Sequence, residues 1–337
     1  MDLKHIIESL NQEQKAELTK LLNQDLTSNL DLVQTSLTND QMVHCPQCNS
    51  TDLYGHGTYK GRKRYKCKSC QSTFNDFTGT AISGIKKTQK FQEYMWLVLE
   101  SISIRKAALK LEVNVKTIFD WRHKILSSLA VVNREEFSGI VECDDKQLNI
   151  NNKGDRNLDR EPYKRPSDRK TKRGVSNDKI SIIVAADRKG NRTMQVAKIG
   201  RVDAKSIENS IGELISAENV LCSDAHPSII AWAKDKKIEH HTFVATKQHI
   251  KDKCYHVQHV NSMDNLYERW IKRFYGVSTK YLEQYLNWFV FLEKIKKSSN
   301  QISELSKNIA NNMESIKNYG TIDSRYAKLF IPQLSKT

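Results

Sequence analysis

The chain has 337 residues, of which 38% are hydrophobic and 28% are charged, and its formal net charge is +15 at pH 7. This composition excludes a disordered chain and leaves room for two or three folded domains. The basic excess indicates a polyanionic partner, and it favours nucleic acid over a membrane surface because no long apolar run or basic amphipathic anchor is present. The amino terminus lacks the apolar stretch of a secretion signal, and four of the seven cysteines form two close pairs. Both features favour a reducing, cytoplasmic compartment with one metal site.

Residues 1–42 predict a short helical segment followed by a linker. Apolar residues recur at helical spacing before residue 25, and Asn11 with Gln14 has the spacing of a capping box. Residues 25–42 are rich in Ser, Thr, Asn, Asp and Gln, which is typical of a linker. The pattern fits a small helical appendage and an oligomerisation element equally well.

The clearest local motif is a pair of C-x-x-C knuckles within residues 43–80. Cys45-Pro-Gln-Cys48 and Cys67-Lys-Ser-Cys70 are separated by 18 residues. A tetrahedral Zn²⁺ needs four thiolates, and two hairpin tips can supply them. Strand-like runs at 54–60 and 64–66 bracket a turn between the knuckles, so we predict a zinc ribbon with one structural zinc ion. Free or redox-active cysteines are the alternative, which is disfavoured because no βαβ pattern surrounds either pair.

Residues 88–130 predict three helices, of which the last two are joined by a tight turn at 112–114. This arrangement is typical of a helix-turn-helix DNA-binding domain, although three-helix units without DNA binding also occur. The zinc ribbon is basic as well, and its charge has two interpretations, a solvated face or contact with phosphates. The candidate DNA-contacting residues of the two modules are Arg64, Lys116, Thr117, Arg122 and Lys124.

From residue 138 the pattern changes to short strands punctuated by helices. The order βββαβα, with a meander first and parallel strands after it, indicates an RNase H-like mixed-sheet domain over 138–293. Two strand-like runs end in carboxylates, Val141-Glu142-Cys143-Asp144-Asp145 and Val220-Leu221-Cys222-Ser223-Asp224. An edge strand with acids facing water is one interpretation. In the predicted order, however, Asp144 and Asp224 lie at the ends of adjacent strands, where they could share a divalent metal ion.

A third candidate acid lies in the helical pattern His256–Leu292. Asn261, Asp264, Glu268 and Lys272 fall on one face of the helical wheel and apolar residues on the other. An ordinary amphipathic helix with a solvated face explains this pattern. A helix packed beside the sheet explains it too, and would lend Asp264, or Asn261, as the third metal ligand.

Two further segments are polar. Residues 151–175 carry nine Lys and Arg against four Asp and Glu, which predicts either a basic loop that grips a DNA backbone or a plain surface insertion. Residues 294–337 are rich in Lys, Ser and Asn and predict a polar C-terminal tail.

Several motifs in this order resemble those of bacterial insertion-sequence DDE transposases with an N-terminal zinc ribbon. The likeness extends over about residues 43–293. The motifs are Tyr65-Lys66-Cys67, Thr78-Gly79-Thr80, Trp121-Arg122-His123-Lys124-Ile125-Leu126, Val141-Glu142-Cys143-Asp144-Asp145, Lys172-Arg173-Gly174, Ser223-Asp224, His259-Val260-Asn261-Ser262 and Gly276-Val277-Ser278-Thr279-Lys280-Tyr281-Leu282. Two positions depart from the family pattern: Asp145 replaces a Glu, and Asp264 stands where such enzymes more often have Glu, Asn or His.

The resemblance implies a multidomain α/β protein in which a zinc ribbon and a helix-turn-helix precede an RNase H-like catalytic domain. It implies transposition by phosphodiester hydrolysis and 3′-OH strand transfer, with two Mg²⁺ ions held by Asp144, Asp224 and either Asp264 or Asn261. The implied partners are double-stranded DNA at the element ends and at the target, contacted also by Lys172 and Arg173. A homo-oligomer on DNA and a nucleoid-associated bacterial location follow from the same likeness.

Two other functions fit parts of the pattern. A DNA-binding regulator derived from a transposase would use the ribbon and the helix-turn-helix without catalysis, but it leaves three interior acids unexplained. A simple metal-dependent nuclease explains the acids, but not the two DNA-reading modules ahead of them.

Overall fold

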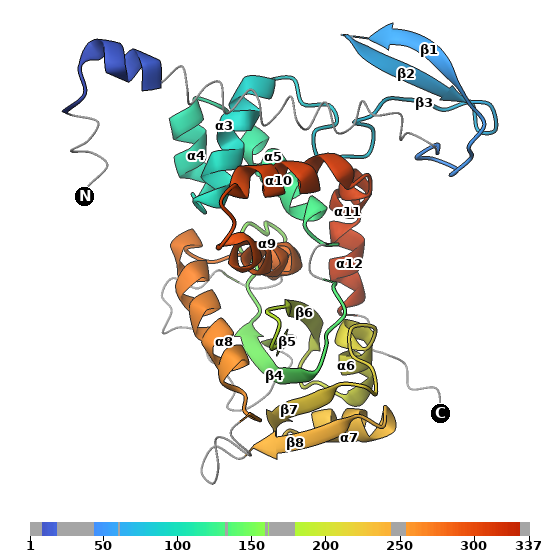
Figure 1. Cartoon of the computed structure of the whole chain (residues 1–337), viewed down its shortest axis with the longest axis vertical. Coiled ribbons are helices and arrows are strands. Elements are labelled where there is room, and N and C mark those ends of the chain that lie inside the picture. The colour runs from blue at the N-terminus through green and yellow to red at the C-terminus, as the bar shows by residue number, and fades with distance from the viewer. Residues whose placement is uncertain are drawn as a thin grey trace. The chain divides into compact units, whose positions relative to one another are not determined.

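The computed structural model describes residues 9–18, 44–59, 61–131, 134–158, 161, 179–243 and 254–330. The chain divides into two compact units (Figure 1). Unit 1 consists of Met1–Ser128 and Ser298–Ile316, and unit 2 of Leu129–Lys297 and Lys317–Thr337. At the start of unit 1, Asn11 and Gln14 form the predicted capping box, in which the amide of each donates to the side chain of the other at 3.0 and 2.8 Å.

The zinc ribbon is a three-stranded antiparallel sheet in the order β1-β2-β3. Its strands are β1 (Leu53–Tyr59), β2 (Arg62–Cys67) and β3 (Thr73–Phe74). Its small core contains two of the cysteines, Cys45 and Cys67, together with Phe74, and Tyr65 packs against it. So few apolar side chains give little hydrophobic stabilisation, which is why a ribbon of this size depends on a metal ion.

Unit 1 also contains the helices α3 (Thr88–Leu99), α4 (Ile104–Leu111), α5 (Val115–Ser128) and α10 (Gln301–Asn311). The turn between α4 and α5 begins at Glu112, whose left-handed conformation (φ 51°) ends α4. α10 contacts both α3 and α5.

The predicted polar tail at 294–337 is wrong in its described part. This part contains α10, α11 (Ser315–Gly320) and α12 (Ile322–Lys328), and Ile302, Leu305 and Ile309 of α10 are buried. These three residues follow the i, i+3, i+7 spacing of one helix face. The surrounding Lys, Ser and Asn residues conceal this stripe in the overall composition.

Unit 2 is built on a five-stranded mixed sheet in the order β6-β5-β4-β7-β8 (Figure 1). β4 pairs antiparallel with β5 and parallel with β7, β5 pairs antiparallel with β6, and β7 pairs parallel with β8. This topology confirms the RNase H-like prediction. The strands are β4 (Ile140–Asn149), β5 (Lys179–Asp187), β6 (Arg192–Ile199), β7 (Val220–Asp224) and β8 (Glu239–Phe243).

Helices cover both faces of this sheet. On one face, α6 (Ala204–Ile211) and α7 (Pro227–Asp235) pack their apolar residues against Val141 and Cys143 of β4. On the other face, α8 (Gln258–Ile271) contacts β4 and β5, and α9 (Leu282–Ile295) contacts β6. Short 3-10 turns at Lys272–Phe274 and Thr279–Tyr281 join α8 to α9. Successive side chains of a strand point to opposite faces, so Glu142, Asp144 and Lys146 point toward α8.

Aromatic side chains hold α8 and α9 together. The rings of Trp270 and Trp288 meet edge to face with centroids 5.1 Å apart, and those of Phe274 and Tyr285 do the same at 5.1 Å. This packing makes α9 a core helix, and most of its residues are buried. Among the helices in the described ranges, none is both long and apolar enough to cross a membrane.

Candidate active site and metal centres

Asp144 lies in the middle of β4 on the face toward α8. Burial raises the pKa of its carboxyl to about 7, and the negative charges of Asp224 and Asp264 contribute to the increase. Because both charges act on Asp144, the three predicted acids occupy one region of unit 2. Asp224 is the last residue of β7, which runs parallel to β4 with Ser223 opposite Cys143.

Asp264 comes to the same region from the middle of α8. Burial raises the pKa of its carboxyl to about 6, although Lys146 of β4 acts in the opposite direction. The Lys146 Nζ lies 3.7 Å from Asp264 Oδ2 and 2.8 Å from Glu268 Oε1. Among the residues that the structure describes, Asp264 Oδ1 is buried without a hydrogen-bond partner. A buried carboxylate oxygen with no donor fits a cation ligand.

The remaining acids and amides of this region are arranged differently. Asn261, the alternative third ligand, is exposed on α8. Asp145 points to the opposite face of β4 from Asp144, and its Oδ1 lies 3.8 Å from His226 Nε2. Burial raises the pKa of Asp145, whereas the neighbouring His226 lowers it.

Two groups of His, Cys, Asp and Glu side chains in the described part of the chain have three or more ligand atoms within 4.8 Å of one another. One is the cysteine set of the ribbon, and the other is Glu142 with His256 and His259. The carboxylate oxygens of the three aspartates, Asp144, Asp224 and Asp264, do not all lie within this distance of one another. Like charges repel, and a bound cation draws carboxylates together, so a wider spacing is expected of three carboxyls on their own.

The sequence motif contains Glu142, but we predicted no role for it. Its side chain is 1% exposed, and its carboxylate accepts hydrogen bonds from the backbone amides of His259 and Val260 at 2.7 and 3.2 Å. These amides belong to the first turn of α8, so Glu142 caps this helix from the neighbouring strand. The signal in the sequence was its position two residues before Asp144, on the same face of β4.

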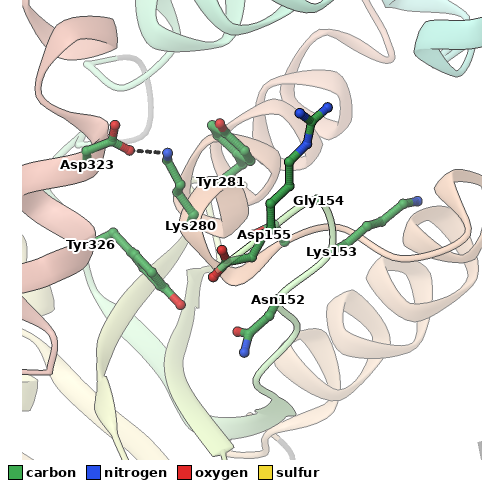
Figure 2. A pocket seen from close by; sticks show the side chains of 10 residues that line it. Asn152, Lys153, Gly154, Asp155, Lys280, Tyr281, Asp323 and Tyr326 are labelled. Carbon is green, nitrogen blue, oxygen red and sulfur yellow. Dashed lines mark ion pairs between the residues drawn. The ribbon is translucent and has the colours of Figure 1, made fainter. Parts of the chain in front are cut away.

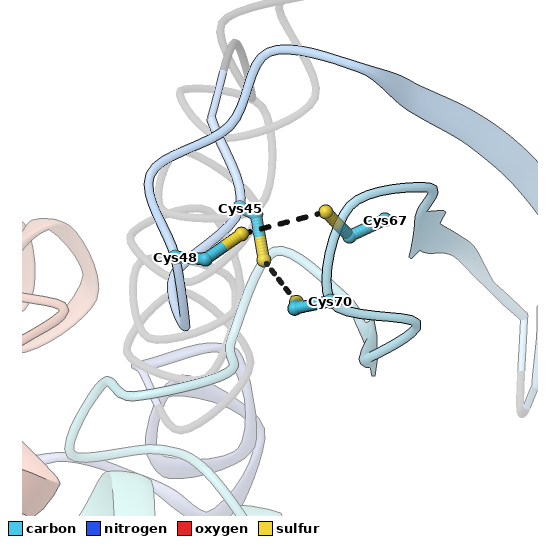
Figure 3. A group of neighbouring side chains, drawn as sticks. All are labelled: Cys45, Cys48, Cys67 and Cys70. Atoms are coloured by element: carbon cyan, nitrogen blue, oxygen red, sulfur yellow. Dashed lines mark hydrogen bonds between the residues drawn. The ribbon is translucent and has the colours of Figure 1, made fainter.

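The four cysteines of the ribbon converge as predicted (Figure 3). The sulfurs of Cys45 and Cys70 are 3.6 Å apart, and so are those of Cys48 and Cys67. Four sulfurs bound to one zinc ion lie about 3.8 Å from one another. The ribbon therefore has the geometry of a structural zinc site.

Hydrogen bonding favours the thiolate form of two of the cysteines and disfavours that of a third. Hydrogen bonds from Ser72 lower the pKa of Cys70 to about 6, and a backbone hydrogen bond from Cys70 lowers that of Cys67. The Ser50 amide also lowers the pKa of Cys48, but hydrogen bonding to Cys70 and burial outweigh it and raise this pKa to about 12. Zinc binding would displace the proton of Cys48, because metal ligation requires the thiolate.

The prediction that Arg122 contacts DNA is wrong. Arg122 is fully buried in unit 1, where its Nε donates to the Tyr94 hydroxyl at 2.6 Å and one Nη donates to the Ile102 carbonyl at 2.5 Å. Its guanidinium joins α5 to α3 and to the start of α4, and DNA cannot reach it.

The other predicted basic residues differ in exposure. Lys116 is exposed at the start of α5, and Thr117 is half-buried. Lys124 is half-buried and donates to the Ser83 carbonyl at 3.0 Å. Arg64 donates to Thr73 Oγ1 at 3.1 Å. The predicted contacts Lys172 and Arg173 lie outside the described residues.

A cavity of about 450 Å³ lies beside the loop that follows β4, and none of the three aspartates lines it (Figure 2). Lys280 and Asp323 form an ion pair at its edge. The Lys153 Nζ donates to three successive main-chain carbonyls, those of Phe274, Tyr275 and Gly276, at 3.2, 3.0 and 2.8 Å. These bonds fasten the loop to the turn between α8 and α9.

Two family models match parts of the chain. Residues 136–294 match the ISXO2-like transposase domain, and residues 41–71 match the InsA N-terminal domain, a zinc ribbon. The chain is 26% identical over 254 residues to a protein of Halobacterium salinarum described as an uncharacterized protein in transposable element ISH50. That match covers 73% of this chain and 84% of the other protein.

A solved chain in the crystal structure of a pre-cleavage Mos1 transpososome is 13% identical, with 65% of this chain and 77% of that chain covered. Its TM-score of 0.19 is too low to carry weight for fold or function. The two matched domains occur in the order that the sequence motifs predicted. The chain is therefore similar to insertion-sequence transposases, with a match to an InsA-type zinc ribbon ahead of a match to an ISXO2-like transposase domain.

Proposed function

We propose that this transposase cuts and joins DNA at the ends of its element with Asp144, Asp224 and Asp264 as the magnesium ligands. The observation that carries the proposal is that the three acids lie close together: β4 and β7 are in register next to Asp144 and Asp224, and the charges of Asp224 and Asp264 both raise the pKa of the partly buried Asp144. Asp144 and Asp264 are partly buried and Asp224 is exposed at the end of β7, and neighbouring carboxylates that repel one another destabilise a fold unless a cation binds them. Two bound Mg²⁺ ions would activate the attacking oxygen and stabilise the leaving one.

The protein's own residues position these ligands. β4 fixes Asp144 next to the end of β7, where Asp224 lies. Asp264 is preferred to Asn261 as the third ligand because its Oδ1 is buried without a hydrogen-bond partner within the described ranges, whereas Asn261 is exposed. Lys146 partly neutralises Asp264 and Glu268 until a metal ion binds.

The zinc ribbon and the α4–α5 pair are proposed to bind the double-stranded ends of the element. The net charge of +15 supports a contact of this kind, because Lys and Arg side chains that neutralise DNA phosphates release bound counterions and so favour binding. We further propose that the chain acts as a homo-oligomer that holds two ends together, in association with the nucleoid.

Cleavage and strand transfer of DNA that carries the element's own ends tests the proposal. Wild type is compared in Mg²⁺ with Asp144→Ala, Asp224→Ala, Asp264→Ala and Asn261→Ala. We expect the three aspartate variants to bind the ends but neither cut nor join them, and the Asn261 variant to remain active. Asp235→Ala, which removes an exposed acid at the end of α7, is the control and should behave as wild type.

The other outcomes select other functions. Wild type that binds the ends and never cuts them under any divalent metal ion would be a regulator. Cutting without joining would indicate a simple nuclease. An active Asp264→Ala variant together with an inactive Asn261→Ala variant would transfer the third ligand position to Asn261.

A further inference from the structure

A buried carboxylate fastens the helix that carries Asp264 to the strand that carries Asp144. One oxygen of Glu142 accepts the backbone amides of His259 and Val260 in the first turn of α8, at 2.7 and 3.2 Å. A negative charge at this end of a helix is stabilised by the helix dipole and by the amides that have no partner within the helix.

The second oxygen of Glu142 lies among three other groups. Arg188, which directly follows β5, donates to it, and the Nδ1 atoms of His259 and His256 lie 2.5 and 3.2 Å away. Arg188 also donates to the Cys254 carbonyl at 2.9 Å, just ahead of α8. A buried acid with an arginine and two amides is fully paired, whereas the loss of any one partner would leave a charge uncompensated.

Glu142, His256 and His259 could also be the donors of a metal ion, because their ligand atoms lie within 4.8 Å of one another. Arg188 decides against this use. One nitrogen of its guanidinium contacts both Glu142 Oε1 and His259 Nδ1. A permanent positive charge therefore already occupies the position between these atoms that a metal cation would take.

The spacing of the contacts matches along the two elements. Asp144 follows Glu142 by two residues, about 7 Å along a strand. Asp264 follows His259 by five residues, about 7.5 Å along a helix. Farther on, Lys146 of β4 reaches Asp264 and Glu268 of α8. β4 and α8 therefore run side by side in the same direction (Figure 1), with the contacts of Glu142 before Asp144 and those of Lys146 after it on β4.

We propose that Glu142 and Arg188 form a latch that sets the register of α8 on β4 and so places Asp264 opposite Asp144. The latch rests on the proposed magnesium site, and Glu142 acts in it as a positioning residue that touches neither metal nor DNA. Without the latch, α8 keeps its aromatic core and the Lys146 contact but loses the fixed point at its amino terminus.

The experiment compares Glu142→Gln, Arg188→Met and the double variant in the full-length, zinc-loaded protein. Glu208→Gln is the matched control, because Glu208 also joins two elements of unit 2, through Lys236 at 2.9 Å and the Trp232 Nε1 at 2.7 Å, away from the acids. Two quantities are measured: amide hydrogen exchange along α8, and the Mg²⁺ concentration that gives half-maximal cleavage.

We expect Glu142→Gln and Arg188→Met to lose exchange protection in the first turns of α8 and nowhere else. Their half-maximal Mg²⁺ concentration should rise about 10-fold to 100-fold, the usual effect of losing a group that orients a metal ligand, with end binding unchanged. The double variant should be less impaired than the two single effects combined, because neither charge is then left alone. Glu208→Gln should change neither quantity near α8.

Three results would overturn the latch. They are unchanged protection and Mg²⁺ dependence in Glu142→Gln, a loss of protection spread evenly over unit 2, and a second bound equivalent of Zn²⁺ or Mn²⁺ in wild type that Glu142→Gln removes. If wild type shows no Mg²⁺-dependent cleavage but the variants still loosen α8 locally, the latch stands and the proposed function fails.

Discussion

Asp264 on α8 lies close enough to Asp144 on β4 for its negative charge to raise the pKa of the Asp144 carboxyl. The pKa is about 7 for Asp144 and about 6 for Asp264, so protons compete with Mg²⁺ for both ligands near neutral pH. At subsaturating Mg²⁺ we expect cleavage to fall about tenfold per pH unit from pH 7 to 6, and more steeply below pH 6. Pre-steady-state cleavage rates over pH 5.5–8.5 measure this, and a flat profile would contradict it.

The same pKa values predict how the stability of metal-free unit 2 depends on pH. Both acids have a higher pKa in the folded than in the unfolded chain, so between about pH 4 and 7 the folded state binds more protons. Stability from these groups is therefore fully present below pH 4 and is lost as the pH rises through 7. We expect Asp144→Asn to raise the free energy of unfolding at pH 8 by on the order of 2 kcal/mol while it abolishes cleavage. Denaturant unfolding measures the change, with Asp235→Asn as the control, and a less stable Asp144→Asn protein would refute it.

The elements that carry the site were predictable because their signals are local. The bounds of β5, Lys179–Asp187, follow from an apolar run that only Ser181 interrupts, and the ribbon follows from the spacing of its cysteines. The cap that Glu142 forms on α8 was not predictable, because it depends on where a helix more than 100 residues later comes to lie. The burial of Arg122 was not predictable for the same reason. An arginine is usually expected on the surface, and only the fold brings this one next to the Tyr94 hydroxyl and the Ile102 carbonyl.

The contrast between Arg122 and Lys116 gives a test of which residues of α5 face DNA. Arg122→Met removes a buried, hydrogen-bonded guanidinium, so we expect it to destabilise unit 1 by about 2–4 kcal/mol and to leave the end-binding affinity of the folded protein unchanged. Lys116→Ala should leave the melting temperature unchanged, weaken end binding several-fold and reduce the salt slope by about 0.9. Thermal melting measures the stability of each variant, and binding titrations over a range of salt concentrations measure its affinity for the ends. The proposal for α5 fails if Lys116→Ala binds like wild type.

Removal of one zinc ligand should unfold the ribbon alone. We expect Cys70→Ser to release about one equivalent of zinc and to weaken end binding, because the small core around Cys67 and Phe74 does not hold the strands without the metal ion. Cys254→Ser changes an exposed cysteine outside the ribbon and should keep both zinc and binding. Metal analysis of the two purified proteins measures the zinc that each one retains. Full zinc content in Cys70→Ser would argue against the four-cysteine site.

Gly79 gives a test of how the carboxy-terminal segment of unit 1 packs. It has a φ of +86°, its carbonyl accepts the Ile316 amide at 3.0 Å, and a Cβ built on it would lie 2.3 Å from the Met313 carbonyl oxygen. Gly84 has a similar φ of +73° but nothing within 4 Å of the same position. Gly84→Ala should therefore cost only the strain of a left-handed backbone, about 1–2 kcal/mol.

Gly79→Ala should cost clearly more, because the backbone of the 313–316 segment must move away. We expect an additional loss of about 2 kcal/mol or more, together with faster hydrogen exchange at the Ile316 amide and in α10. The melting temperature of each variant and its exchange map give the comparison. Equal destabilisation by the two substitutions would mean that the segment does not pack against Gly79 in solution, and α10 would then have to be held by its contacts with α3 and α5 alone.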